Sequence, residues 1–251
     1  MKISGGLREN GVVVGNAYDK YGSRNPIARW LMQGFESALT ELVDRVKPTS
    51  IHEVGCGEGY WTLKWVKEGI VARGSDFSSA VIDLARANAT EHKLPTEIFK
   101  TCSIYDLSPA LESADLVVCS EVLEHLERPE DGLNALQSIA SPYLIISVPR
   151  EPLWSAMNMA RGKYWADFGN TPGHIQRWSQ GQFLGLVSRY FDVEELRTPI
   201  PWTMLLCRRH GGQSHRGIRS PKTYPALGRF GPGHSRRGLR HYEVGGIREP
   251  H

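Results

Sequence analysis

The stretch Ile51-His52-Glu53-Val54-Gly55-Cys56-Gly57-Glu58-Gly59-Tyr60 decides the fold. Its first residues are typical of a strand, and they run directly into three glycines at alternate positions. Glycine has no Cβ, so it permits unusual φ/ψ values and lets a bound molecule approach the backbone closely. In doubly wound α/β folds, a glycine cluster between a strand and a helix binds a nucleotide-like cofactor. The stretch therefore predicts a cofactor loop at the end of a parallel strand.

The spacing of the glycines narrows the kind of cofactor. The dinucleotide fingerprint is Gly-x-Gly-x-x-Gly, and its third glycine would fall at Tyr60. The chain instead has Gly-x-Gly-x-Gly, with Glu53 two places before the first glycine, which argues against a nicotinamide oxidoreductase. Asp76 follows the next predicted strand, where a carboxylate can accept hydrogen bonds from both hydroxyls of a ribose. The pattern therefore indicates a cofactor that contains a ribose but is not a dinucleotide.

The composition is that of a soluble globular protein. The chain has 251 residues, of which 40% are hydrophobic and 23% charged, and no apolar run approaches the roughly 20 residues that span a bilayer. The first residues contain no continuous apolar segment of the kind found in secretion signals, so we expect a cytoplasmic protein. The four cysteines are widely spaced, which favours buried free thiols over disulfides or a zinc site.

The charge is distributed unevenly along the chain. The net charge is +3, but residues 211–251 carry eight Lys/Arg and two Asp/Glu, which leaves −3 for residues 1–210. The last 41 residues are rich in glycine and proline and have no apolar periodicity, so we expect a disordered basic tail. Such a tail is either an extension without selected function or a weak contact for nucleic acid or acidic partners.

Strand and helix patterns alternate through the middle of the chain. The expected strands are Ser50–Val54, Ile70–Gly74, Glu97–Cys102, Ala114–Ser120, Tyr143–Val148, Tyr190–Pro199 and Trp202–Arg208. The expected helices are Pro26–Val46, Tyr60–Lys67, Ala80–Lys93, Pro129–Ile139 and Gln180–Arg189. This rhythm predicts an α/β fold with a seven-stranded, mostly parallel sheet and helices on both faces.

The same patterns predict how the chain is divided. Residues 1–17 are expected to form a flexible lead-in, residues 18–210 one domain, and residues 211–251 the tail. The segment 150–178 interrupts the strand–helix rhythm and is rich in aromatic residues. Long segments of this kind in a compact domain are usually functional, so we expect it to lie on the substrate side.

Four motifs in order resemble the class I S-adenosylmethionine-dependent methyltransferases, in the small-molecule branch that includes the ubiquinone-biosynthesis O-methyltransferases. They are Glu53–Gly59, Asp76, Ser103–Leu107 and Asp115–Leu126, and the resemblance covers roughly residues 15–210. The resemblance implies a Rossmann-like sheet whose last strand is antiparallel, with S-adenosylmethionine as cofactor.

The resemblance also implies roles for the matched residues. Glu53 and the loop of Gly55, Cys56, Gly57 and Gly59 would hold the methionine part of the cofactor. Asp76 would bind the ribose, with Phe77 flanking the adenosine, and Ser103 and Ile104 would contact the adenine. Cys119 or Ser120 would offer a backbone carbonyl to the methionine ammonium group.

The sequence predicts fewer details of the residues that would contact the methyl acceptor. A hydroxyl acceptor benefits from a general base, and His125 and His174 are the candidates. The alternative for His125 is a structural residue that covers the cofactor pocket. Tyr18, Tyr21 and Trp154, together with His174, are expected to line the acceptor side or else to pack in the core. We expect no metal, because His52 beside Glu53 has no second ligand at a usable spacing.

The sequence thus predicts methyl transfer to a small molecule, at a hydroxyl oxygen rather than a nitrogen. The alternatives are an N-methyltransferase of a small amine, a nucleic-acid or protein methyltransferase tethered by the basic tail, and a cofactor-binding domain without turnover. The residues after the fourth strand, Cys119-Ser120-Glu121-Val122-Leu123, lack the Pro-Pro-aromatic motif of enzymes that methylate exocyclic amines, so nucleic acid is disfavoured as a substrate. The sequence leaves the oligomeric state open.

Overall fold

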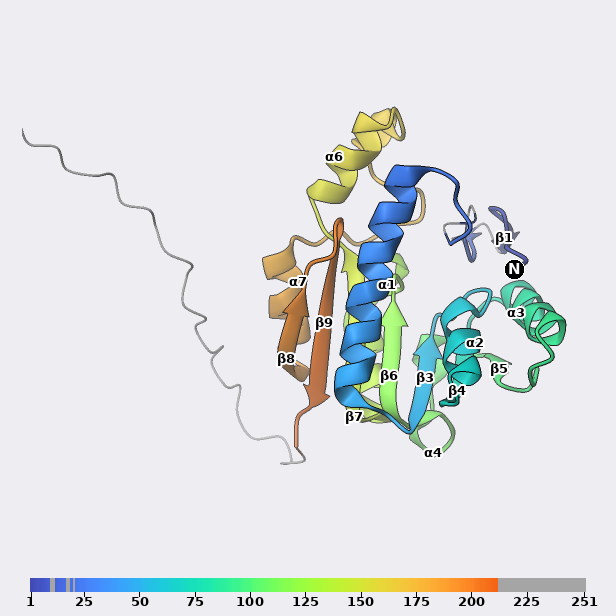
Figure 1. Cartoon of the computed structure of the whole chain (residues 1–251). Coiled ribbons are helices and arrows are strands. Elements are labelled where there is room, and N and C mark those ends of the chain that lie inside the picture. Colours follow the sequence, from blue (N-terminus) through green and yellow to red (C-terminus); the bar gives the residue numbers. More distant parts are fainter. Residues whose placement is uncertain (10–11, 17–18, 20, 212–251) are drawn as a thin grey trace, which may run out of the picture. The chain divides into compact units, whose positions relative to one another are not determined.

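The runs predicted as strands form one seven-stranded sheet in the computed structural model (Figure 1). The strands are β3 (Ser50–Val54), β4 (Val71–Asp76), β5 (Phe99–Thr101), β6 (Ala114–Ser120), β7 (Ala140–Pro149), β8 (Phe191–Arg197) and β9 (Trp202–Arg209). Their order across the sheet is β5-β4-β3-β6-β7-β9-β8. The neighbours from β5 to β7 pair in parallel, whereas β9 runs antiparallel to both β7 and β8. The predicted fold class is confirmed, including the antiparallel last strand.

The structure describes residues 1–9, 12–16, 19 and 21–211, which fall within one unit, Met1–Arg216. Tyr18 and the basic tail beyond Gly211 lie outside the described residues. All four cysteines are described and are free thiols; Cys56, Cys119 and Cys207 are buried, whereas Cys102 is half-buried. None of the helices in these ranges combines the length and the apolar character that a bilayer-spanning helix needs.

Alternation along the strands directs side chains to two separate cores. On one face, residues such as Leu116, Val118 and Ile145 pack against α1 (Pro26–Val46) and α2 (Tyr60–Lys67). The α1 helix begins where the sequence predicts, because Asn25 accepts hydrogen bonds from the backbone amides of the first turn and Pro26 needs no donor partner there. Its buried Leu39 and Leu42 form the centre of this core.

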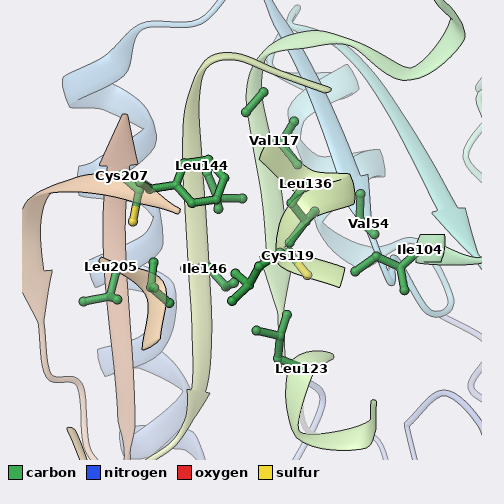
Figure 2. Close-up of a cluster of buried hydrophobic side chains, with 14 of the residues drawn as sticks. Val54, Ile104, Val117, Cys119, Leu123, Leu136, Leu144, Ile146, Leu205 and Cys207 are labelled. Carbon is green, nitrogen blue, oxygen red and sulfur yellow. The ribbon is translucent and has the colours of Figure 1, made fainter. Parts of the chain in front are cut away.

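The opposite face carries the intervening residues of the same strands. Val117, Cys119, Leu144 and Ile146 pack with α5 (Pro129–Ile139) and α7 (Gln180–Val187), and Figure 2 shows Cys119 among apolar side chains there. Because successive side chains of a strand point to opposite faces, one apolar run supplies both cores. The third helix of the alternation, α3 (Ser79–Glu91), packs with Phe99 of β5 in a smaller cluster.

Several short elements were not predicted. The N-terminal segment contains a hairpin of β1 (Arg8–Glu9) and β2 (Val12–Val13), and a short α4 (Pro109–Glu112) precedes β6. Within the segment 150–178, α6 (Leu153–Ala160) lies at the end of the sheet toward which β3 and β6 point (Figure 1). Three 3₁₀ turns, η1 (Ile104–Asp106), η2 (Leu123–His125) and η3 (Trp165–Asp167), follow β5, β6 and α6.

The N-terminal segment contacts the domain. Glu58 accepts hydrogen bonds from the backbone amides of Ser4 and Asn16, at 2.9 and 2.8 Å. Lys2 and Asn88 of α3 are joined by two further hydrogen bonds. The described part of the expected lead-in therefore lies against the glycine loop and α3, a placement that its aperiodic sequence did not predict.

Candidate active site

A cavity of about 900 Å³ opens at the carboxyl ends of the central parallel strands. Small-molecule sites typically span about 300–1,000 Å³, so this cavity has room for a cofactor together with a second small molecule. It is lined by the glycine loop after β3, by the turns that follow β4, β5 and β6, and by residues of the N-terminal segment and the segment 150–178. This is the edge where open α/β sheets bind their ligands.

The glycines of the loop have different physical roles. All three have positive φ, which strains any other residue. A Cβ on Gly55 would lie 2.2 Å from Val122, and one on Gly59 would lie 2.5 Å from the ring of Phe99. A Cβ on Gly57 would meet only the side-chain nitrogen of Asn16, at 4.0 Å. Gly57 is thus the position where the backbone faces open space, while Gly59 permits close packing against Phe99 of β5 and Ala85 and is absent from the cavity wall.

Two carboxylates, the buried Glu53 and the half-buried Asp76, flank this loop. Asp76 accepts hydrogen bonds from the backbone amides of Gly57 and Ser78, each at 3.1 Å, and Glu53 accepts one from the amide of Thr62 at 2.9 Å. Burial raises the pKa of Asp76. Burial, followed by the charges of Glu53 and Asp76, raises the pKa of the Cys56 thiol far above its usual range. The loop therefore lies in a negative field that favours a cationic ligand.

The next turns supply an apolar and a polar surface. The ring of Phe77 is 53% exposed yet lines the cavity, so an apolar face is open to a ligand. Ile104 lines the cavity from η1, and Ser103 caps η1 by accepting a hydrogen bond from the amide of Tyr105. The buried hydroxyl oxygen of Ser120 has no hydrogen-bond partner among the described residues. The side chain of Cys119 points away into the core, and Cys119 does not line the cavity.

Aromatic residues line further parts of the cavity. Tyr21 stacks on Tyr60 with ring centroids 3.6 Å apart, and its hydroxyl accepts a hydrogen bond from the indole of Trp61 at 3.0 Å. Trp154 of α6 donates its indole hydrogen to the hydroxyl of Thr171 at 2.9 Å. Both predicted residues line the cavity, and both are fixed there by hydrogen bonds. His52 lies elsewhere, buried with both ring nitrogens in hydrogen-bond contact, as expected of a core residue.

The two candidate histidines meet in space although 49 positions separate them in sequence. Their rings lie 4.9 Å apart at 81°, and the ring of His174 also stacks on Trp154. Burial lowers the pKa of His125. Burial, together with His125 and Arg177, lowers the pKa of His174 to about 3, so both rings are neutral at neutral pH. The carboxylate of Glu124, 2% exposed, lies beside them.

The comparisons with known proteins agree with this geometry. Residues 24–191, more than half of the chain, match a protein family described as Methyltransferase domain. The chain belongs to this methyltransferase domain family.

The similarity to individual curated proteins is limited to shorter segments of the chain. Over 100 residues, this methyltransferase domain is 33% identical to a chloroplastic magnesium protoporphyrin IX methyltransferase of Arabidopsis thaliana, covering 39% of the chain and 32% of the relative. Over 97 residues it is 27% identical to a ubiquinone biosynthesis O-methyltransferase of Coxiella burnetii, covering 39% of the chain and 41% of the relative. The matched regions thus span well under half the length of these curated relatives.

The similarity to solved structures covers a larger part of the chain. The crystal structure of a magnesium protoporphyrin IX methyltransferase from Synechocystis PCC 6803 with bound SAH has a TM-score of 0.58 and 20% identity. The match covers 75% of this chain and 90% of that one. The methyltransferase architecture is therefore shared well beyond the segments whose sequences align.

Sequence reasoning missed several residues of the cavity wall. Asn16 and Arg8 reach it from the N-terminal segment, and Glu121 stands at the end of β6 with a positive φ of 59°. The carboxylate of Glu121 accepts a hydrogen bond from the indole of Trp202 at 2.7 Å. The sequence places Glu121, Glu124 and His125 within five residues. Only the fold shows that His174 lies beside Glu124 and His125.

Proposed function

We propose that this protein transfers a methyl group from S-adenosylmethionine to a hydroxyl oxygen of a small molecule. The proposal rests on one observation. Glu53, the glycine loop and Asp76 line the same cavity as His125 and His174. The first set of residues, the cofactor wall, suits a cationic, ribose-bearing cofactor, and the second, the acceptor wall, suits a polar acceptor held among aromatic rings. Ubiquinone biosynthesis O-methyltransferase, a relative by sequence, carries oxygen methylation in its name.

The residues of the first wall fit the proposed cofactor. S-adenosylmethionine carries positive charge at its sulfonium and ammonium groups, and the field of Glu53 and Asp76 complements that charge. The open backbone at Gly57 and the unpaired hydroxyl of Ser120 offer further polar contacts. When bound, the cofactor supplies an electrophilic methyl group that needs no further activation. We propose that Asp76 binds its ribose and that Phe77 and Ile104 enclose its adenine.

The second wall would position the acceptor. Tyr21, Trp154, His125 and His174 line the cavity, and the ring of Trp154 stacks on that of His174. Alignment of two reactants in a closed site supplies several kcal/mol of a transfer barrier, of the order that proximity effects provide. We propose that these residues hold the hydroxyl in line with the methyl group.

Calorimetry with S-adenosylmethionine tests the cofactor half of this proposal. We expect binding by the wild-type protein and a loss of at least about 10-fold in affinity for Asp76→Ala, since buried hydrogen bonds to a charged group contribute about 1.5–3 kcal/mol. Asp83→Asn, which alters an exposed carboxylate on α3, is the matched control and should bind normally. Failure of the wild type to bind, or equal binding by Asp76→Ala, would refute the assignment.

A transfer assay with tritiated methyl groups tests the acceptor half. Quinols, phenols and sugars should accept the label at oxygen, whereas small amines should not. Transfer confined to the amine pool would replace the hydroxyl acceptor with an amine.

A further inference from the structure

The hydroxyl group of Thr171 lies on a tight turn in the acceptor wall. In Thr171-Pro172-Gly173-His174, proline and glycine hold the second and third positions, and Gly173 has the positive φ, 94°, that a type II turn requires there. The amide of His174 closes the turn by donating to the carbonyl oxygen of Thr171 at 3.0 Å. The turn therefore brings Thr171 and His174 close together, and both residues line the cavity.

The α6 helix supplies two hydrogen-bond donors to this hydroxyl. Trp154 and Asn158 are one helical turn apart, so their side chains lie on the same face of α6. The indole Nε1 of Trp154 donates to Oγ1 of Thr171 at 2.9 Å, and the amide Nδ2 of Asn158 donates to the same oxygen at 3.2 Å. An indole nitrogen can only donate, which fixes the direction of the first hydrogen bond.

The neighbours of Asn158 fix the direction of the second hydrogen bond. The side-chain oxygen of Asn158 accepts from the guanidinium group of Arg161, which can only donate. The Nδ2 atom of Asn158 also donates to the carbonyl oxygen of Gly169 at 2.8 Å, and a carbonyl can only accept. Because these two partners leave one orientation for the amide group, the atom that faces Thr171 is a donor. Asn158 is 1% exposed, so protein groups hold it in this orientation.

The two donors leave the hydrogen of the Thr171 hydroxyl without a partner. A threonine hydroxyl has two lone pairs and one hydrogen, and Trp154 and Asn158 occupy both lone pairs. The hydrogen must then point elsewhere, and the part of the chain that the structure describes offers it no acceptor within hydrogen-bond distance. Since Thr171 lines the cavity, the hydrogen is available to a bound molecule. A polar hydrogen that would otherwise stay unpaired favours a ligand that accepts a hydrogen bond there.

The charge of the cavity limits the group that can accept this hydrogen bond. Five carboxylate side chains line the cavity, against two arginines. The carboxylates are those of Glu53, Asp76, Glu121, Glu124 and Glu127, and the arginines are Arg8 and Arg128. This excess of negative charge disfavours a carboxylate or phosphate group on the ligand and leaves a neutral oxygen. Among neutral oxygens, a carbonyl carries no hydrogen that would need a partner of its own.

The hydroxyl that receives the methyl group is the wrong partner for Thr171. Its oxygen loses electron density as it attacks the methyl carbon, so a hydrogen bond donated to it would be stronger in the ground state than in the transition state. Only interactions that strengthen in the transition state accelerate the chemical step. The hydrogen of Thr171 therefore suits a second oxygen of the acceptor.

We propose that Thr171 selects the methyl acceptor by donating a hydrogen bond to a neutral carbonyl oxygen, which the acceptor carries in addition to the hydroxyl that is methylated. This inference rests on the proposed function and narrows its substrate class to hydroxy-carbonyl compounds. Trp154 and Asn158 act as positioning residues, because they orient the hydrogen of Thr171 through its two lone pairs.

Matched pairs of acceptors test this selection. The full-length protein is assayed with methyl-tritiated S-adenosylmethionine and the 2-, 3- and 4-isomers of hydroxyacetophenone, each beside the ethylphenol in which a methylene group replaces the carbonyl. We expect at least one ketone to exceed its ethylphenol in kcat/KM, and Thr171→Val to reduce that ratio about 10-fold. Comparing the ratio between two enzymes cancels the different intrinsic reactivities of the two phenols. Thr171→Ser keeps the hydroxyl and should keep the ratio.

The ratio separates selection of the acceptor from a structural role. Thr171→Val also leaves the donors of Trp154 and Asn158 without their acceptor, but a loss of packing would slow transfer to both members of a pair and leave their ratio unchanged. Trp154→Phe removes one of the two orienting donors and should lower the ratio about threefold. Thr90→Val, at an exposed position on α3, is the matched control and should change neither rate nor ratio.

Three results would overturn the selection by Thr171. They are an unchanged ratio in Thr171→Val, a wild-type protein that prefers no ketone over its ethylphenol, and a wild-type protein that binds S-adenosylmethionine but methylates none of these phenols. Calorimetry with S-adenosylmethionine accompanies each assay, and the Thr171 variants should bind within about threefold of the wild type. A wild-type protein that does not bind S-adenosylmethionine would instead overturn the proposed function.

Discussion

The two walls of the cavity are built in different ways. The proposed cofactor wall consists of turns that directly follow β3, β4 and β5, and its backbone amides and carboxylates satisfy one another locally, as with Gly57 and Asp76. The proposed acceptor wall joins η2 to residues 171–176, nearly 50 positions further along the chain, through backbone hydrogen bonds to Glu124 and a histidine contact to Gly173. The sheet determines the geometry of the cofactor wall, whereas the geometry of the acceptor wall depends on a few contacts between loops.

This difference means that cofactor binding and methyl transfer should be separable by mutation. Changes in the glycine loop should damage binding and stability together, because the loop is also where β3 turns into α2. Changes on the acceptor wall should leave the sheet and the cofactor loop intact. Two further predictions test this separation, and a third tests the contacts between the N-terminal segment and Glu58.

The largest effect is expected at Gly55 on the cofactor wall. In Gly55→Ala the new Cβ would lie 2.2 Å from the branched side chain of Val122, at a φ of 76° that strains alanine. Strain of this kind costs about 1–3 kcal/mol, and displacement of the loop should weaken S-adenosylmethionine binding at least about 100-fold. Thermal unfolding and calorimetry measure the two effects.

A matched glycine on α1 supplies the control. A Cβ on Gly34 would meet nothing within 4 Å, so Gly34→Ala should keep cofactor affinity and gain about 0.5–1 kcal/mol of stability from helix propensity. Normal cofactor binding by Gly55→Ala would show that the loop is not the cofactor site.

A smaller and more selective effect is expected at Gly173 on the acceptor wall. Its φ is 94°, and its carbonyl oxygen orients His125. Gly173→Ala should shift that carbonyl and lower the transfer rate about 10-fold, while cofactor affinity stays within about threefold. The assay is single-turnover transfer beside calorimetry. Gly181→Ala, where a Cβ on α7 meets nothing within 4 Å, should change neither quantity, and parallel losses of rate and affinity in Gly173→Ala would mean that the two walls are coupled.

The same contrast explains how far sequence reasoning reached. The sheet, its helices and the positions of Glu53, Asp76 and Ile104 were predictable, because each of these residues lies at or just beyond the end of a strand whose pattern the chain displays. A Cβ at Gly59 would meet Phe99, and the side chain of Cys119 packs among apolar neighbours, while the backbone roles predicted for both residues stay predictions. The local sequence pattern predicts which turn a residue belongs to, whereas the direction of its side chain depends on tertiary packing.

The acceptor wall was predictable only in part. The aromatic segment 150–178 was expected on the substrate side, and Trp154 and His174 do line the cavity. The meeting of His174 with Glu124 and His125 depends on hydrogen bonds between two irregular segments, and irregular backbone has no period to read. The N-terminal contacts to Glu58 were missed for the same reason.

The smallest expected effect concerns those N-terminal contacts, which join Ser4 and Asn16 to Glu58 of the glycine loop. Burial acts to raise the pKa of Glu58, but backbone hydrogen bonds from Ser4 and Asn16 outweigh it, and the net pKa is lower than the ordinary 4.5. A carboxylate whose folded pKa is lowered stabilises the fold above its unfolded pKa and loses that contribution as the pH falls through the folded pKa. The contribution of Glu58 should therefore be complete above about pH 5 and decline below pH 4.5.

Melting curves against pH measure this contribution. At pH 7, Glu58→Gln should lower Tm by about 2–4 °C, the shift that corresponds to roughly 1 kcal/mol in a domain of this size. The difference from the wild type should narrow as the pH falls below 4.5, because protonation then removes the same charge from the wild type. Glu91→Gln, at an exposed position that ends α3, is the control and should show no such trend. A constant difference at all pH values would mean that the side chain of Glu58 acts by packing, and that the N-terminal segment does not depend on its charge.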